Sequence, residues 1–101
     1  MSDQVNRQRQ DAMRGEDAAR VLESRAFKEA MEALKGQIVT DWSNCPVRDV
    51  EGQRLFLQLH KLSRKFEALL TGMVETGKLA RLELDAERDE SAARKLFRRV
   101  I

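Results

Sequence analysis

Few side chains in this sequence are suited to chemistry, and none of them stands in a catalytic or metal-binding pattern. His60 is the single histidine and Cys45 the single cysteine, so a metal site or an activated nucleophile would lack its partner residues. Glu83 and Glu87 stand four residues apart and would share a helix face, which a solvated surface explains best. Phosphate loops, HExxH and nucleophile elbows are absent from the sequence. We therefore expect no enzyme, no cofactor and no metal.

The basic carboxy-terminal end is the strongest electrostatic feature. The segment before it is acidic, and the net charge of the whole chain is only +2, so the distribution of charge matters more than the total. Cations favour a helix C-terminus without having any function; the alternatives are contact with phosphates or with an acidic partner. DNA binding would be non-specific, because no base-reading motif is present. The candidate contacts are Arg94, Lys95, Arg98 and Arg99.

Composition predicts an all-α chain of a single domain. The chain has 101 residues, 36% of them charged, with one Pro, five Gly and no Tyr, a balance that favours helix over sheet. No apolar run approaches the roughly 18 residues of a membrane span, and the amino-terminus has no hydrophobic signal core. We expect a cytoplasmic protein without a membrane partner.

Three regions are expected along the chain. Residues 1–15 are polar and have no apolar period, which predicts a flexible arm. Residues 16–77 are expected to form a long antiparallel helical hairpin. Residues 78–101 are expected to form a shorter C-terminal helical segment with a basic amphipathic end, whose apolar residues would dock on a partner.

The expected hairpin has two helices of similar length, at about 16–42 and 49–76. Pro46 disfavours helix at the residue before it and marks the break between them. Asp49 is suited to be the N-cap of the second helix, and Gly77 is placed as the glycine that follows a helix end. A short loop between two such helices favours antiparallel packing.

A wide apolar stripe lies on the second predicted helix. Its central row, Leu59, Phe66 and Met73, repeats every seven residues, and flanking rows widen the stripe to roughly 140°. A single neighbouring helix cannot cover it, because it exceeds the seam of a two-stranded coiled coil. We therefore expect a homo-oligomer. The expected interface consists of Phe56, Leu59, Ser63, Phe66, Leu70 and Met73.

The stretch from Pro46 to Leu84 has a loop proline, an acidic helix start and a closing turn: Pro46, then Arg48, Asp49, Glu51 and Gly52, then Glu75, Thr76, Gly77 and Lys78. With these motifs it resembles a group of small tailed-phage head and packaging proteins. The hairpin also resembles the oligomerisation core of small terminase subunits, in which hairpins pack side by side in a ring. That family usually adds a helix-turn-helix for DNA, for which this chain has no room.

The resemblance implies a non-enzymatic phage assembly protein. It would act in genome packaging as a small-terminase-like ring, or as a minor virion component, and would be found in the host cytoplasm or the virion. Besides its own copies, its expected partner is a larger phage assembly protein. The alternative is a small helical nucleic-acid-binding or regulatory adaptor protein.

Overall fold

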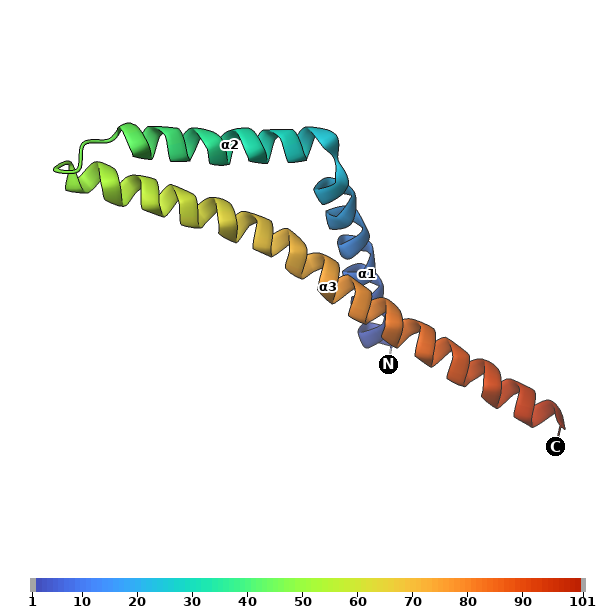
Figure 1. Ribbon diagram of the computed structural model, residues 1–101. Helices are drawn as coiled ribbons and strands as arrows, with labels where there is room; N and C mark the ends of the chain where they lie inside the picture. Colours follow the sequence, from blue (N-terminus) through green and yellow to red (C-terminus); the bar gives the residue numbers. More distant parts are fainter. Residues whose placement is uncertain (1, 101) are drawn as a thin grey trace. The chain divides into compact units, whose positions relative to one another are not determined.

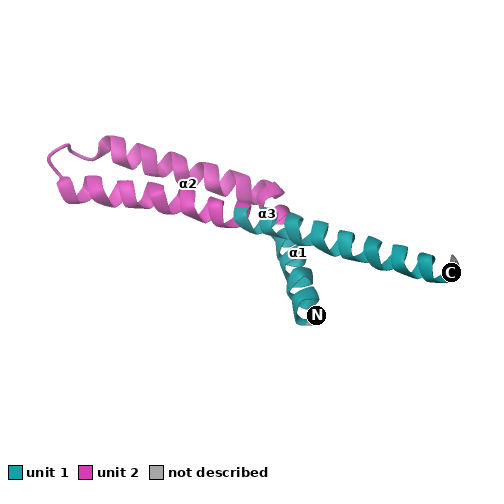
Figure 2. Ribbon diagram, turned by 90° about the horizontal axis from the view of Figure 1, so that it is seen from below, with its two compact units in different colours: residues 1–18, 72–101 teal, residues 19–71 magenta. Residues whose placement is uncertain are grey.

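The computed structural model describes residues 2–100, and they form three helices (Figure 1). α1 spans Ser2–Glu23, α2 spans Arg25–Asn44 and α3 spans Val50–Val100. The all-α class predicted from the composition is confirmed. The chain divides into two compact units, coloured separately in Figure 2. We call residues 19–71 the hairpin unit, and residues 1–18 with 72–101 the crossing unit.

In the hairpin unit, α2 lies alongside the first part of α3 and runs in the opposite direction (Figures 1 and 2). Phe27, near the start of α2, contacts Phe66, with 6.1 Å between the ring centroids. Trp42, at the end of α2, lies 6.3 Å from His60. Lys35 of α2 forms an ion pair with Glu67 of α3. The buried residues of the unit are Met31, Ile38 and Ser63.

Gln53 joins the end of α2 to the loop that follows it. The indole Nε1 of Trp42 donates a hydrogen bond to Gln53 Oε1 at 2.6 Å. Gln53 Nε2 donates in turn to the carbonyl oxygens of Cys45 at 3.1 Å and Pro46 at 3.3 Å. One amide side chain thus gives the indole N–H an acceptor and gives a donor to each of two loop carbonyls. The carbonyl oxygen of Pro46 also accepts from the backbone N–H of Asp49 at 3.0 Å.

The start of α3 follows the sequence prediction. Asp49 Oδ1 accepts a hydrogen bond from the backbone N–H of Gly52 at 3.0 Å, the bond that an N-cap residue makes in the first turn of a helix. Val50 is the first helical residue. Asp49 therefore caps α3, and its negative charge lies at the positive end of the helix dipole.

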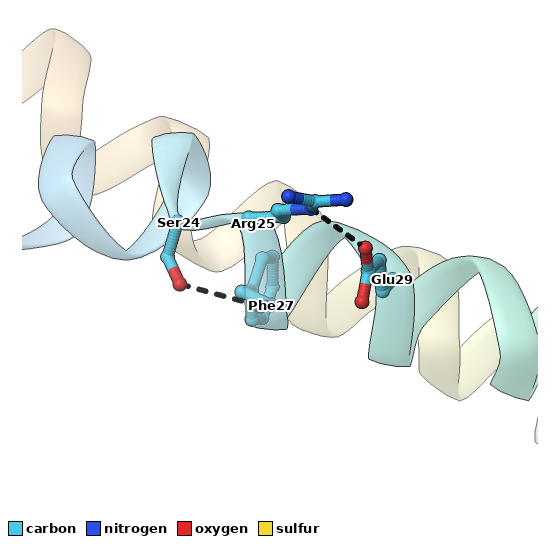
Figure 3. A network of polar contacts seen from close by, with 4 residues as sticks. All are labelled: Ser24, Arg25, Phe27 and Glu29. Atoms are coloured by element: carbon cyan, nitrogen blue, oxygen red, sulfur yellow. Dashed lines mark hydrogen bonds and ion pairs between the residues drawn. The ribbon is translucent and has the colours of Figure 1, made fainter.

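The predicted helix over residues 16–42 is instead interrupted at Ser24 (Figure 3). Ser24 has φ −61° and ψ 129°, an extended conformation that ends α1. Its hydroxyl accepts a hydrogen bond from the backbone N–H of Phe27 at 3.3 Å, which makes it the N-cap of α2. A lone serine in a helix-favouring run is a weak signal, because neither proline nor glycine accompanies it.

In the crossing unit, α1 lies against α3 (Figure 2), and the two backbones meet at Gly15 and Gly77. A Cβ atom on Gly15 would lie 2.8 Å from the Cα of Gly77 and 2.9 Å from the carbonyl oxygen of Met73. A Cβ atom on Gly77 would lie 2.7 Å from the Cα of Gly15 and 2.9 Å from the carbonyl oxygen of Asp11. Because a side-chain carbon does not fit at these distances, the two backbones can touch only where both residues are glycine.

Alanines and polar pairs surround this glycine contact. The buried apolar residues of the unit are Ala12, Ala18 and Ala80. Gln8 Nε2 donates to Glu83 Oε2 at 2.8 Å, and Arg81 pairs with Glu16 at 2.9 Å. Because both polar contacts are exposed and such pairs contribute little, close backbone packing is the main attraction between α1 and α3 here.

The crossing differs from what the sequence analysis expected. Residues 2–15 are helical from Ser2 on, where a flexible arm was expected. Gly77 lies inside α3 and does not end it, and no glycine among the described residues has a positive φ. Residues 78–100 therefore continue α3 and do not form a separate segment. The contact is made by small residues, which do not produce the periodic pattern of large apolar residues that indicates helix packing in a sequence.

The glycines of the crossing can be tested against one that touches nothing. Gly15→Ala adds a Cβ against Gly77, so we expect the free energy of unfolding to fall by roughly 1–3 kcal/mol. Gly36→Ala adds a Cβ with nothing within 4 Å, so we expect it to rise by roughly 0.5–1 kcal/mol through better helix propensity. Urea unfolding followed by circular dichroism measures both. Equal stabilisation by the two substitutions would show that Gly15 is not in contact.

Candidate functional site

The six residues of the expected interface differ in how far the chain itself covers them. Ser63 is buried, at 5% exposure, and its hydroxyl donates to the carbonyl oxygen of His60 at 2.7 Å. Phe56 and Leu70 are half-buried on the side of α3 that faces α2. Leu59 and Phe66 remain exposed, as does Met73 in the crossing unit. The chain itself thus occupies half of the predicted set.

A second row of large apolar residues lies on α3 beside the side that faces α2. We call it the outer row; its exposed fractions run from 37% to 62%. Each residue stands one position before a residue of the facing side, about 100° around the helix. The spacings of 4, 3, 4 and 3 residues are those of a coiled-coil seam. The outer row consists of Leu55, Leu59, Leu62, Phe66 and Leu69.

Part of α2 extends this apolar surface. In an antiparallel pair of helices, residues that precede the facing side by one position lie on the same side of both helices. Ala26, Ala30 and Leu34 hold that position on α2, and all three are exposed. We call the outer row together with these three residues the hairpin face. Its alanines leave room for another helix to approach closely.

The size of the hairpin face identifies it as the best candidate for a functional site. At about 200 Å² for a large side chain, the outer row alone exposes on the order of 500 Å². This is about the size of the largest apolar patch on a typical monomer, and such patches are often functional. The interface predicted from the sequence includes Leu59 and Phe66 of this row but not Leu55, Leu62 and Leu69. The regular spacing of these three leucines with Leu59 and Phe66 is the sequence signal that could have placed them in the interface.

The groups most suited to chemistry lie outside the hairpin face. His60 contacts Trp42 on the side that faces α2. Cys45 lies in the loop, and its thiol donates a weak hydrogen bond to Asp49 Oδ2 at 3.7 Å. Among residues 2–100, no three His, Cys, Asp or Glu side chains are grouped as metal ligands would be.

The loop thiol is shifted away from reactivity. Desolvation raises the pKa of Cys45 above its ordinary value, and the negative charge of Asp49 and its hydrogen bond with the thiol raise it further. All three effects disfavour the thiolate, which is the nucleophilic form. A catalytic cysteine needs the opposite shift, so this environment suits an inert thiol.

The four carboxy-terminal cations lie on the last turns of α3, and all of them are exposed. Arg94 pairs with Glu90 one turn earlier, at 2.7 Å. By helical period Arg94 and Arg98 share one side of α3, while Lys95 and Arg99 lie further around it. Acidic residues therefore lie along the same helix side as two of the four candidate contacts.

Comparisons with known proteins return no match to a protein family, to a curated protein or to a solved structure. Within residues 2–100, none of the helices combines the length and the apolar character that crossing a membrane requires. The exposed faces of the helices are therefore the features that bear on function.

The environment of Cys45 predicts that its thiol reacts slowly in the folded chain. Because its pKa is raised, we expect iodoacetamide to alkylate the folded chain at pH 8 several-fold more slowly than the urea-unfolded chain. Asp49→Asn removes the charge but keeps an N-cap residue, so the folded chain should react faster. Rates followed by mass spectrometry decide it. If Asp49→Asn reacts at the wild-type rate, the carboxylate does not hold the thiol protonated.

Proposed function

We propose that this protein is a non-enzymatic, oligomeric assembly protein and that the hairpin face is its self-association surface. The single observation that supports this proposal is the outer row: large apolar side chains at coiled-coil spacing that remain exposed although α2 already packs on the neighbouring side. A row of this kind gains stability only when another helix covers it.

The area is suited to a second copy of the chain. Two outer rows brought together would remove about 1,000 Å² from water, near the lower limit of specific interfaces. The exposed alanines of α2 and the flanks of the row add to that area. Apolar faces pair without charge repulsion, so one copy can use the same surface as the next. Two copies that use the same surface form a closed pair, and a larger assembly needs a second surface on each chain.

The resemblance of residues 46–84 to small tailed-phage proteins suggests the biological setting. In that setting the oligomer acts in genome packaging, as a small-terminase-like ring, or as a minor virion component beside a larger phage assembly protein. The genes adjacent to this one test the setting independently of the oligomer. Capsid, portal or large terminase genes would support it, and a neighbourhood without any phage gene would count against it.

Two pairs of substitutions test the self-association surface. Leu62→Glu with Leu69→Glu introduces two carboxylates into the outer row, and both positions are well exposed in the single chain. We expect this variant to become monomeric while its helicity is retained, because charge at an apolar interface is costly to desolvate. Light scattering coupled to size exclusion measures the mass at tens of micromolar.

The matched control introduces the same charges on another side of α3. Ala68→Glu with Thr71→Glu changes two exposed residues outside the outer row, and we expect it to keep the wild-type mass. A wild-type chain that is monomeric at tens of micromolar would refute the proposal. So would loss of the oligomer in both variants alike, because that would reflect net charge and not the surface.

A further inference from the structure

The distal part of α3 makes no packing contact within its own unit. Every residue from Ala86 to Arg99 is exposed. Helices in proteins gain most of their stability from packing an apolar face, so an unpacked stretch of this length suggests a contact outside the single chain. It belongs to the crossing unit and is separate from the hairpin face.

A row of apolar residues begins at Leu79 and runs along one side of this part of α3. Helical period places its members on one side, away from the side where α1 crosses at Gly77. Its three large members are exposed by 58% to 67%. Asp89 interrupts the row at its middle, which shortens the apolar contact that it can make. We call this row the distal seam; it consists of Leu79, Leu82, Ala86, Ala93 and Phe97.

A row of charges runs directly beside the distal seam, one position further along the sequence. We call it the distal charge row; in chain order it is Glu83, Glu87, Glu90, Arg94 and Arg98. The first three positions are acidic and the last two are basic. In a parallel pair the two copies of this row would lie on opposite sides of the pair and would not meet. An antiparallel neighbour would place the acidic part against the basic part.

We propose that the distal part of α3 binds the same segment of a second copy, antiparallel, about a twofold axis near residues 90 and 91. In this register Glu87 lies opposite Arg94 of the second copy, and Glu83 lies opposite Arg98. In the same register Leu82 lies opposite Arg99 of the second copy, two residues (about 3 Å along the helix axis) from Phe97. The apolar seam supplies attraction, and the charge row selects the antiparallel orientation. This contact goes beyond the proposed function because it is a second self-association surface.

Nucleic acid fits this surface less well than a second copy does. The arginines that would meet phosphates lie on the same helix side as three glutamates, and one of these, Glu90, already pairs with Arg94. A phosphate backbone that follows the helix would be repelled along the acidic part. It would also leave the distal seam in water, whereas a second copy covers it.

Charge reversal at one pair of positions tests the proposal. The experiment uses the full chain carrying Leu62→Glu and Leu69→Glu, so that the hairpin face does not contribute. Sedimentation equilibrium gives the dissociation constant of the remaining pairing. Glu87→Arg or Arg94→Glu alone places like charges opposite each other twice per pair, and we expect about tenfold weaker pairing from each.

Restoration separates this contact from a general loss of structure. A mixture of the two single variants, and the chain that carries both substitutions, again place opposite charges together. We expect both to recover the starting dissociation constant to within about threefold, since ion pairs are regained without new apolar contact. Asp89→Leu fills the gap in the distal seam and should tighten pairing. Circular dichroism verifies that helicity is unchanged throughout.

The outcomes that would overturn the proposal are distinct. A chain that stays monomeric up to about 1 mM, with the hairpin face disabled, lacks the contact. If the double variant pairs no more tightly than the single variants, residues 87 and 94 do not meet. Duplex DNA binding that weakens with Arg94→Glu and is indifferent to Phe97→Ser would assign the segment to phosphates. None of these results depends on whether the hairpin face self-associates, so the two proposals fail separately.

Discussion

The contact between the backbones of Gly15 and Gly77 is the constraint on which the crossing unit depends. Two helix axes can come this close only where neither helix carries a side chain at the point of contact. The contact explains why polar residues at the amino-terminus form a helix, since the rest of that helix has only alanines to bury. It also explains why α3 continues through a glycine that would otherwise be suited to end it.

Packing on small residues has a cost in burial. Five apolar residues are buried among those described, and three of them are alanines. Leucines and phenylalanines of α3 remain on the outside as a result, in the outer row and in the distal seam. A chain whose cores are this thin gains little stability from its own burial, and binding of another molecule to its folded form would add to that stability. The exposed rows and the glycine contact are therefore consequences of the same architecture.

The sequence predicted the parts of the fold that depend on strong local signals. The N-cap at Asp49 and the all-α class followed from capping chemistry and composition. The break at Ser24 did not, because one hydroxyl decides it and the flanking residues favour helix on both sides. The helix around Gly15 was missed since its partner lies far away in the sequence. For the site, periodicity located the apolar stripe, but only the packing of α2 shows that Ser63 is covered and Leu62 is not.

The glycine contact also limits how this chain can diverge. Positions 15 and 77 are separated by most of the sequence, yet each can accept only the smallest residue while the other backbone lies against it. A larger residue at one position cannot be compensated by a smaller one at the other, because glycine has no side chain that could be shortened. Gly36 and Gly72, which have open space around them, carry no such coupling. In an alignment of related chains, paired glycines at 15 and 77, with free variation at 36 and 72, would therefore be the trace of this crossing.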